Sequence, residues 1–381
     1  MAIDSPFDTF TGIISPFGQR RVGGGAVPFS PASLFAGGQE GLLLGAFDID
    51  TLFQVSDGTT PVTVATDPIG YFGDKSGNDN HATQATAAAR PIYQTGPARA
   101  TLNKVDDRLL VTVPTGGFEG TMVLATDQGT ASYGVAIPAG PYDIGGRGGR
   151  HFPGNAIVGQ LIRDGALSEG EAAATEADFV EKGATASYGA VTNFSRFWRD
   201  WTEITSFPLI DTSAGTNFIR AWRGCTSLTS FPLLDTSAGT NFNQAWLGCT
   251  SLTSFPLIDT SAGISFFRAW RGCTSLTSFP LIDTSAGTNF FEAWYGCTSL
   301  TTIPAGLFDN IQGGDFTEAF TNTDLTQTSI DNVLVSLVTS GIATGTRVFN
   351  QSGGSAPSST GEAAIDTLRS RGWTVTVTGG Y

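Results

Sequence analysis

The stretch Cys225-Thr-Ser-Leu-Thr-Ser-Phe-Pro-Leu-Leu-Asp-Thr-Ser-Ala-Gly-Thr-Asn-Phe-Asn-Gln-Ala-Trp-Leu-Gly248 is one copy of a 24-residue unit that recurs through the middle of the chain. The unit repeats its cysteine at Cys225, Cys249, Cys273 and Cys297. It repeats its tryptophan at Trp198, Trp222, Trp246, Trp270 and Trp294. A fixed period in the twenties is typical of a solenoid, in which each unit is one coil stacked on the last. We therefore expect a repeat solenoid over residues 186–320.

The unit also indicates how each coil is built. Leu-Thr-Ser-Phe has the two-residue alternation of a short strand, and the proline after it limits hydrogen bonding on one side. Asp-Thr-Ser can cap a helix, so we expect a short helix around Phe-x-x-Ala-Trp and then a glycine turn. One coil cannot bury its own leucine, phenylalanine, isoleucine and tryptophan side chains, so coils must stack and the ends need caps. Trp201, Phe197 and Asp200 replace the repeated cysteine, alanine and glycine, which predicts a cap at the first coil.

The four cysteines occupy one column of the repeat. Stacking would place neighbouring thiols about 4.8 Å apart, which is close to the disulfide limit, but parallel strands would not turn them toward each other. We therefore expect free, buried thiols that pack as small apolar groups. A zinc site is disfavoured because neither His81 nor His151 lies in the repeat.

The composition excludes several classes of protein. With 381 residues, 40% of them hydrophobic, and 49 glycines, the chain can form two or three domains of mainly β structure with short helices. Its net charge is −14 and it has only three lysines, so we expect no nucleic-acid partner. No apolar run approaches the length of a membrane span and the first residues do not form a secretory signal. We expect no membrane partner and synthesis in the cytoplasm.

Two further segments differ in character from the repeat. Residues 1–33 are broken by proline and glycine yet apolar, which favours an arm that becomes ordered on a partner over a disordered leader. Its candidate docking residues are Phe7, Phe10, Ile13, Ile14 and Phe17. Residues 34–185 predict a β-sandwich, with strands at 60–65, 108–113, 121–125 and 157–162. A helix should follow at 169–182, where Ser168 and Glu171 can form a capping box.

The last segment, residues 321–381, predicts an α/β cap for the solenoid. Its helices are expected at 329–337 and 360–369 and its closing strand at 373–377. The stretch Asp331-Asn-Val-Leu334 and the repeated Gly-Cys-Thr-Ser-Leu and Asp-Thr-Ser resemble the leucine-rich repeats of BspA-like surface proteins from bacteria and phages. This resemblance covers nearly all of residues 191–381.

The first domain carries a second resemblance. The stretches Asp74-Lys-Ser-Gly-Asn-Asp-Asn-His-Ala-Thr-Gln84 and Ala89-Arg-Pro-Ile-Tyr93 are similar to the opening of a concanavalin-like or laminin-G-like module of bacteriophage virion proteins, here truncated between residues 107 and 154. The two resemblances imply a structural protein of a tailed-phage virion, such as a tail fibre or receptor-binding subunit. They imply a trimer, docked through its arm on other virion proteins, that presents the solenoid to a host surface glycan or protein. Alternatives are a capsid decoration protein or head fibre, a polysaccharide-cleaving tail enzyme, and a bacterial adhesin.

No catalytic, cofactor-binding or metal-binding constellation stands out. The chain has neither a Gly-x-Ser-x-Gly elbow nor a His-Glu-x-x-His helix, so we expect no enzyme. The run Gly145–Gly149 lacks the lysine of a phosphate loop and reads as a plain loop. Calcium-type oxygens between Asp74 and Asn80 lack the spacing of a twelve-residue loop, which favours a turn. A glycosidase pair of carboxylates stays open, because two acids can meet in space from any part of a chain.

Candidate recognition residues lie where the repeats differ. The copies hardly differ elsewhere but vary at the positions of Thr216, Ile219, Arg220 and Arg223 and at the equivalent positions in the following coils, which we call columns. On a short helix these positions would point away from the buried side, and Arg and Tyr are enriched at binding hot spots. The candidate partner-binding residues are Arg220, Arg223, Leu247, Phe267, Arg268, Arg271, Phe291 and Tyr295. The alternative is a solvated face whose arginines neutralise an aspartate column, made of Asp211, Asp235, Asp259 and Asp283.

Overall fold

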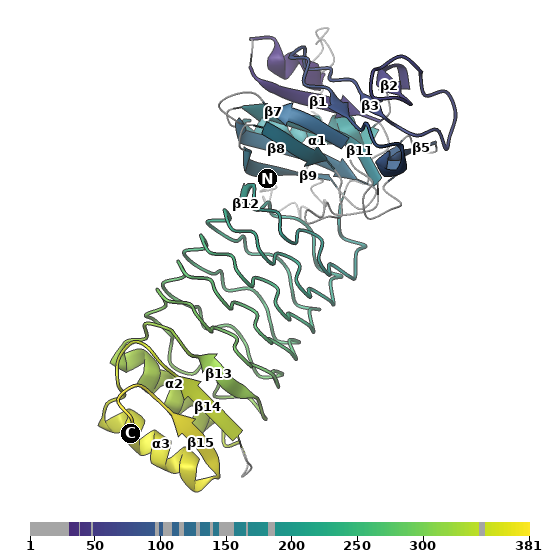
Figure 1. The fold of residues 1–381 in the computed structure, drawn as a ribbon. Coiled ribbons are helices and arrows are strands. Elements are labelled where there is room, and N and C mark those ends of the chain that lie inside the picture. Colours follow the sequence, from purple (N-terminus) through teal and green to yellow (C-terminus); the bar gives the residue numbers. More distant parts are fainter. Residues whose placement is uncertain are drawn as a thin grey trace, which may run out of the picture.

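The computed structural model describes residues 30–37, 39–46, 49–95, 99–101, 109–113, 118–126, 130–137, 140–144, 156–164, 167–181, 187–342 and 347–381. They form an elongated molecule with a β domain at one end, stacked coils in the middle and a small α/β unit at the other end (Figure 1). The predicted docking residues lie outside the described residues: Phe7, Phe10, Ile13, Ile14 and Phe17.

The first domain contains two antiparallel sheets. The larger has the strand order β12-β9-β8-β11-β6-β5, with β1 also paired to β11. Its strands are β1 (Gly41–Gly45), β5 (Ile92–Gln94), β6 (Arg99–Thr101), β8 (Phe118–Thr126), β9 (Thr130–Ile137), β11 (Ala156–Asp164) and β12 (Ile204–Ser206). The smaller has the order β10-β7-β4-β3-β2, with β2 (Leu52–Phe53), β3 (Tyr71–Phe72), β4 (Ala82–Thr83), β7 (Leu109–Val113) and β10 (Gly140–Ile144). Three short 3-10 helices complete this domain, η1 (Pro31–Phe35), η2 (Ile49–Thr51) and η3 (Ala87–Ala89).

Buried side chains of both sheets belong to one apolar cluster, which includes Leu42 and Leu44 of β1 and Leu52 and Phe72 of the smaller sheet. The strands expected at 108–113, 121–125 and 157–162 are present as β7, β8 and β11. Whether the two sheets form a concanavalin-like sandwich stays a prediction.

The strand expected at 60–65 is wrong. Only an isolated bridge joins Pro61 to Phe53. The Asp67 carboxylate accepts hydrogen bonds from the backbone N–H groups of Thr63 and Val64 at 2.8 and 3.0 Å. Because this side chain captures donors that a strand would use for pairing, the segment turns instead.

The helix α1 (Glu169–Glu181) packs on β8 and β9 and confirms the predicted capping box. Ser168 N donates to Glu171 Oε2 at 2.8 Å, and Glu171 N donates to Ser168 Oγ at 3.3 Å. Phe179 of this helix is buried against Leu43, whose neighbours in β1 face the other side of the sheet. The larger sheet is therefore covered on two faces.

The middle of the molecule is a stack of coils, which we call the coil stack (residues 191–320). Parallel bridges join residues that are 24 positions apart, as between Asn217 and Asn241. Equivalent aromatic rings lie above one another, with centroids 5.3 Å apart for Trp222 and Trp246 and 5.4 Å apart for Phe218 and Phe242. These side chains are fully buried. Repetition of one large ring at one position therefore produces a continuous aromatic core.

The short helix expected around Phe-x-x-Ala-Trp is wrong. Arg220 has a φ of 58°, which is left-handed and incompatible with an α-helix. Every second backbone N–H donates instead to a carbonyl of the next coil. Phe218 N donates to Asn241 O and Trp222 N donates to Ala245 O, both at 2.9 Å. The amides between them bond within their own coil, as Ala221 N does to Phe218 O at 3.1 Å. Hydrogen bonding between coils thus replaces helical bonding.

The leucine that follows each proline was expected to be buried between coils, and this expectation is wrong. The leucine after each proline faces solvent, with exposed fractions of 75%, 63%, 62% and 52% for Leu209, Leu233, Leu257 and Leu281. The next residue of the coil turns inward, and Ile258 is 2% exposed. Identity between coils therefore does not by itself mark a buried position.

The cysteine column is free and buried, as predicted. Each thiol points to a tryptophan carbonyl of the preceding coil, and Cys249 Sγ lies 3.1 Å from Trp222 O. Burial raises the pKa of every one of these thiols, to about 12 for Cys297.

Both ends of the coil stack are covered. At the first end β12 belongs to the first coil and also pairs with β9. Tyr133 of β9 contacts the Trp201 ring at 4.9 Å between centroids, and its hydroxyl accepts a hydrogen bond from Trp198 Nε1 at 3.3 Å. The predicted cap residue Trp201 therefore packs against the first domain.

At the other end the aromatic columns continue into β13 (Phe316–Phe320), where Phe316 stacks on Phe290 and Phe320 on Trp294. Strands β13, β14 (Arg347–Gln351) and β15 (Trp373–Thr376) form a parallel sheet. The helices α2 (Gln327–Thr339) and α3 (Ser359–Ser370) pack together, and they contain the two helices predicted at 329–337 and 360–369.

Candidate functional site: the variable face of the coil stack

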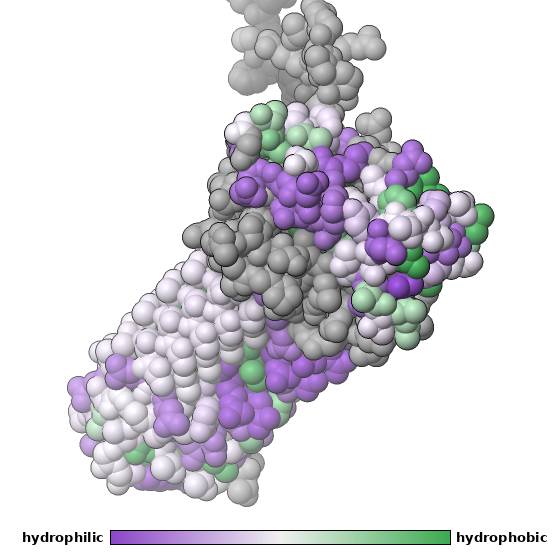
Figure 2. Space-filling model, turned by 45° about the horizontal axis from the view of Figure 1, so that its top comes forward, coloured by the Kyte–Doolittle hydropathy of each residue, from purple (hydrophilic) through white to green (hydrophobic). Residues whose placement is uncertain are grey.

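Most of the differences between coils lie on one lateral surface, which we call the variable face. It comprises the columns headed by Thr216, Ile219, Arg220 and Arg223 in the coil of residues 205–228. Most of its side chains are half-buried. Figure 2 shows one face of the coil stack that is mostly pale, of intermediate hydropathy, with hydrophilic side chains gathered along one edge.

The C-terminal half of the variable face is organised by Glu292. Its carboxylate accepts two hydrogen bonds from Arg268, from Nε at 3.1 Å and from Nη2 at 2.9 Å, and it pairs with Arg271 Nη1 at 2.8 Å. Glu292 is only 7% exposed, whereas both arginine side chains remain about a third exposed, at 31% and 37%. One buried acid therefore fixes the orientation of two arginines.

These arginines hold an aromatic surface. Phe267 and Phe291 stack with ring centroids 5.4 Å apart, and the Arg268 guanidinium lies 4.7 Å and 5.4 Å from the two rings. Arg271 lies 4.7 Å from the Tyr295 ring. Cations over aromatic faces at these distances are attractive, so the rings and the ion pairs stabilise one arrangement.

The N-terminal half of the variable face is different in charge. Arg220 Nε donates to Gln244 Oε1 at 3.0 Å, and Arg223 makes no side-chain hydrogen bond or ion pair with the described part of the chain. Arg196 and Arg199 occupy the equivalent positions of the preceding coil. Partial burial and the positive charges of the other three arginines lower the pKa of Arg220. Four arginines thus crowd together here.

The aspartate column forms no ion pair with these arginines in the described ranges, and whether the variable face is a solvated surface stays open. Asp235 Oδ1 accepts hydrogen bonds from Ser237 N at 3.1 Å and from Ser237 Oγ at 2.7 Å, and Asp259 does the same with Ser261. The aspartates close turns instead.

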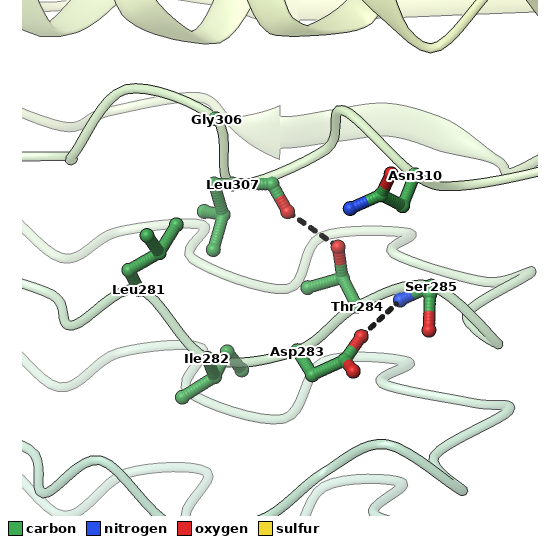
Figure 3. A pocket seen from close by; sticks show the side chains of 8 residues that line it. All are labelled: Leu281, Ile282, Asp283, Thr284, Ser285, Gly306, Leu307 and Asn310. Carbon is green, nitrogen blue, oxygen red and sulfur yellow. Dashed lines mark hydrogen bonds between the residues drawn. The ribbon is translucent and has the colours of Figure 1, made fainter.

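A surface pocket of about 190 Å³ lies where the last regular coil meets the cap (Figure 3). It opens because Ala305 and Gly306 take the positions that Leu281 and Ile282 hold one coil earlier. The only acid that lines it is Asp283, which accepts a hydrogen bond from a backbone N–H at 2.8 Å. A glycosidase needs two carboxylates, so this pocket lacks the required pair.

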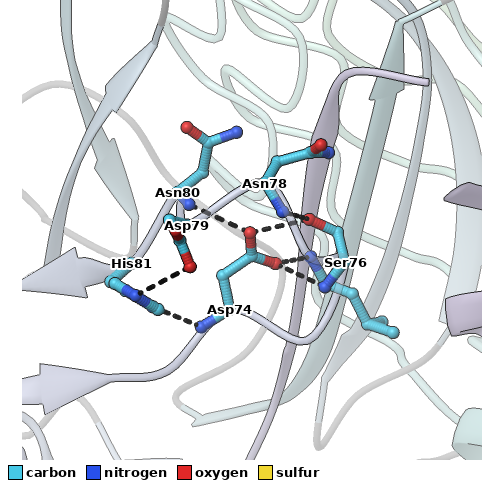
Figure 4. A network of polar contacts seen from close by, with 7 residues as sticks. Asp74, Ser76, Asn78, Asp79, Asn80 and His81 are labelled. Carbon is cyan, nitrogen blue, oxygen red and sulfur yellow. Dashed lines mark hydrogen bonds and ion pairs between the residues drawn. The ribbon is translucent and has the colours of Figure 1, made fainter. Parts of the chain in front are cut away.

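The loop that carried calcium-type oxygens is a turn (Figure 4). Asp74 Oδ1 accepts hydrogen bonds from Leu43 N and Ser76 N, both at 2.8 Å, and Oδ2 accepts from Ser76 Oγ at 2.7 Å and Asn80 N at 3.0 Å. His81 Nδ1 accepts from Asp74 N at 2.9 Å. The Asp74 carboxylate therefore accepts four hydrogen bonds from the described residues.

The described residues contain neither a metal-binding cluster nor a helix that could span a membrane. In these ranges no three His, Cys, Asp or Glu side chains gather closely enough to hold a metal ion. Among the described helices, none has both the length and the apolar character needed to cross a bilayer.

Comparison of the chain with protein-family models, with curated proteins and with solved structures finds no match. The resemblances to phage virion modules and to BspA-like repeats therefore stay predictions.

The predicted site residues separate into two groups. Phe267, Arg268, Arg271, Phe291 and Tyr295 come together at the C-terminal half. Arg220 and Arg223 lie at the N-terminal half, with Leu247 between the groups in the sequence of coils.

The binding residues predicted from the sequence leave out three charged residues of these columns and of the coil before them: Arg196, Arg199 and Glu292. The two arginines lie 24 residues before Arg220 and Arg223, so the period could have found them in the imperfect first coil. The central role of Glu292 depends on burial, which the sequence does not show.

Proposed function

We propose that this chain is a non-enzymatic structural and host-recognition protein of a tailed bacteriophage, such as a tail fibre or receptor-binding subunit. In this proposal the N-terminal arm docks on other virion proteins, the first domain forms a trimeric collar, and the coil stack presents its variable face to a host surface glycan or protein. The chain would be located in the virion. The sequence resemblances to phage virion modules and surface repeats support the phage setting.

One observation carries the recognition role. Other exposed positions of the coil do not vary. The leucine at the position of Leu209 and the serine at the position of Ser213 are the same in all four coils. Exposure alone therefore does not explain why residues change on the variable face. Binding explains the variation, since a surface that fits a partner needs different side chains in successive coils, whereas a scaffold can repeat the same side chains.

Imaging tests the virion location. Antibodies against residues 321–381 should label the tail of the phage that carries this protein. Label on the head instead would favour the capsid decoration alternative, and no label on virions would contradict the proposal.

A reducing-sugar assay tests the enzymatic alternative. The full chain incubated with envelope polysaccharide of the host should release no reducing ends. Release that disappears when a carboxylate is replaced by its amide would favour the polysaccharide-cleaving enzyme.

A further inference from the structure

The two columns that begin at Arg196 and Arg199 change charge along the coil stack. The first reads Arg, Arg, Gln, Arg, Glu and Glu from residue 196 to residue 318, and the second reads Arg, Arg, Leu, Arg, Tyr and Thr from residue 199 to residue 321. Positive charge is therefore concentrated in the first two coils, in a cluster we call the arginine cluster: Arg196, Arg199, Arg220 and Arg223.

The same column shows what an arginine does when the next coil supplies an acid. Arg268 has Glu292 above it and forms two hydrogen bonds with its carboxylate. Arg196 has Arg220 in that place, one coil away, and coils are spaced so that the neighbouring rings of Phe194 and Phe218 lie 5.3 Å apart. Geometry that joins opposite charges at one end of the face therefore brings like charges together at the other.

The arginine cluster has few partners among the described residues. Its one carboxylate contact in the described ranges is Asp200 Oδ2, 2.8 Å from Arg199 Nε. Arg220 donates to Gln244 through Nε, while the side chains of Arg196 and Arg223 make no hydrogen bond or ion pair there. Arg196 is exposed and the other three arginines are half-buried, so the cluster keeps guanidinium donors available at the surface.

Backbone conformation gives an independent indication that these side chains are needed. All six residues of the first column have a left-handed φ between 51° and 64°, where glycine is the residue with least strain. The coils do use glycine at their other left-handed position, as at Gly224 with a φ of 76°. Long polar side chains at the first column therefore serve something other than the turn itself.

We propose that the arginine cluster binds the carboxylate or phosphate groups of an acidic surface polysaccharide. Planar guanidinium groups match both oxyanions with paired hydrogen bonds, and an anion between the arginines would replace repulsion by attraction. The assignment rests on the proposed role in surface recognition and names the chemistry of the ligand.

The size of the cluster favours a polysaccharide over a nucleic acid. Four arginines span two coils of a chain whose net charge is −14. Nucleic acids carry charge continuously and need an extended basic surface, whereas separated anionic groups on a polysaccharide need only a local one.

Binding of the full chain to defined polymers tests the proposal. The probes are polygalacturonate, poly(glycerol phosphate), neutral dextran and a single-stranded oligonucleotide, each at NaCl concentrations from about 0.05 to 0.5 M, across which charge screening increases strongly. The test variant is Arg196→Gln/Arg220→Gln/Arg223→Gln. The matched control is Leu209→Ser/Leu233→Ser/Leu257→Ser, which changes three exposed side chains of the coil stack that lie outside the variable face.

The proposal predicts binding to at least one acidic polysaccharide, none to dextran, and weakening with salt. The test variant should lose affinity by on the order of tenfold or more, because charge-assisted pairs are lost. The control should bind within about twofold of the parent chain. Binding to polygalacturonate would identify carboxylate as the recognised group, and binding to poly(glycerol phosphate) would identify phosphate.

Three results would overturn the assignment: equal binding by the test variant, no binding to either acidic polymer at low salt, or stronger binding of the oligonucleotide. The test variant removes like charges and should fold. Arg223→Gln alone is the fallback, because that side chain has no hydrogen-bond or ion-pair partner among the described residues. Cell attachment separates the two proposals. Attachment that survives in the test variant but is lost in Phe267→Ser/Tyr295→Ser would leave the recognition role standing without the anion site.

Discussion

Replacing Glu292 by glutamine should destabilise the coil stack, because it leaves Arg268 and Arg271 without their shared carboxylate. Breaking one partner of a fully buried ion pair costs about 3–5 kcal/mol. Here the acid is 7% exposed but the arginine side chains are 31% and 37% exposed, so water can solvate part of what they lose. We expect Glu292→Gln to lower the free energy of unfolding by about 1–3 kcal/mol.

Urea unfolding followed by tryptophan fluorescence measures this change, because six of the seven tryptophans lie in the coil stack. A double-mutant cycle with Arg268→Gln isolates the pair. The double variant should lose less than the sum of the two single variants by about 1–2 kcal/mol. A cost for Glu292→Gln below about 0.3 kcal/mol, or strict additivity, would refute the reasoning that this buried acid organises the face.

Three further outcomes are expected. Deleting residues 229–252 should give a folded, monodisperse chain by circular dichroism and light scattering, because the columns on either side stay in register, whereas deleting only 229–240 should not. Burial and raised pKa values should keep the cysteines unreactive to a thiol reagent at pH 8 in the folded chain, with all four reacting in urea. Hydrogen bonds from Ser261 lower the pKa of Asp259 below 3.8, so its contribution is present above that pH and is lost as the pH falls through the folded-state pKa. In Asp259→Asn the acid-unfolding curve should lose this component, and an unchanged curve would contradict the assignment.

Periodicity was the most informative feature of the sequence, because stacked coils place the same residue against itself. The repeated Phe218 and Trp222 fill the aromatic core, and Cys249 is buried beside them. Local patterns also predicted the helices α1, α2 and α3 outside the repeat, since a capping box such as Ser168 with Glu171 depends only on residues a few positions apart.

The errors arose where contacts between coils override local preference. The cap-like Asp-Thr-Ser predicted a helix, but alternate amides of each coil bond to the next coil, and that needs the left-handed backbone of Arg220. Constancy was also read as burial, although Leu209 is constant and 75% exposed. Repetition of a residue shows that its environment repeats, whether that environment is core or solvent.

The candidate site was predictable in position and only partly in composition. Differences between coils identified Arg268, Phe291 and Tyr295, which do come together. The sequence could not show that Glu292 is buried between two arginines, because that depends on side-chain directions across neighbouring coils.

Attachment to bacterial cells tests the central claim, that the variable face is a recognition surface. Fluorescently labelled full chain is compared with the variant Arg220→Ser/Arg223→Ser/Arg268→Ser/Arg271→Ser, and with a control that changes the exposed leucine row, Leu209→Ser/Leu233→Ser/Leu257→Ser/Leu281→Ser. Our account predicts that the arginine variant loses attachment on the order of tenfold or more while the leucine control keeps it, since Arg is enriched at binding hot spots. Equal attachment by the folded arginine variant and the parent chain would contradict it.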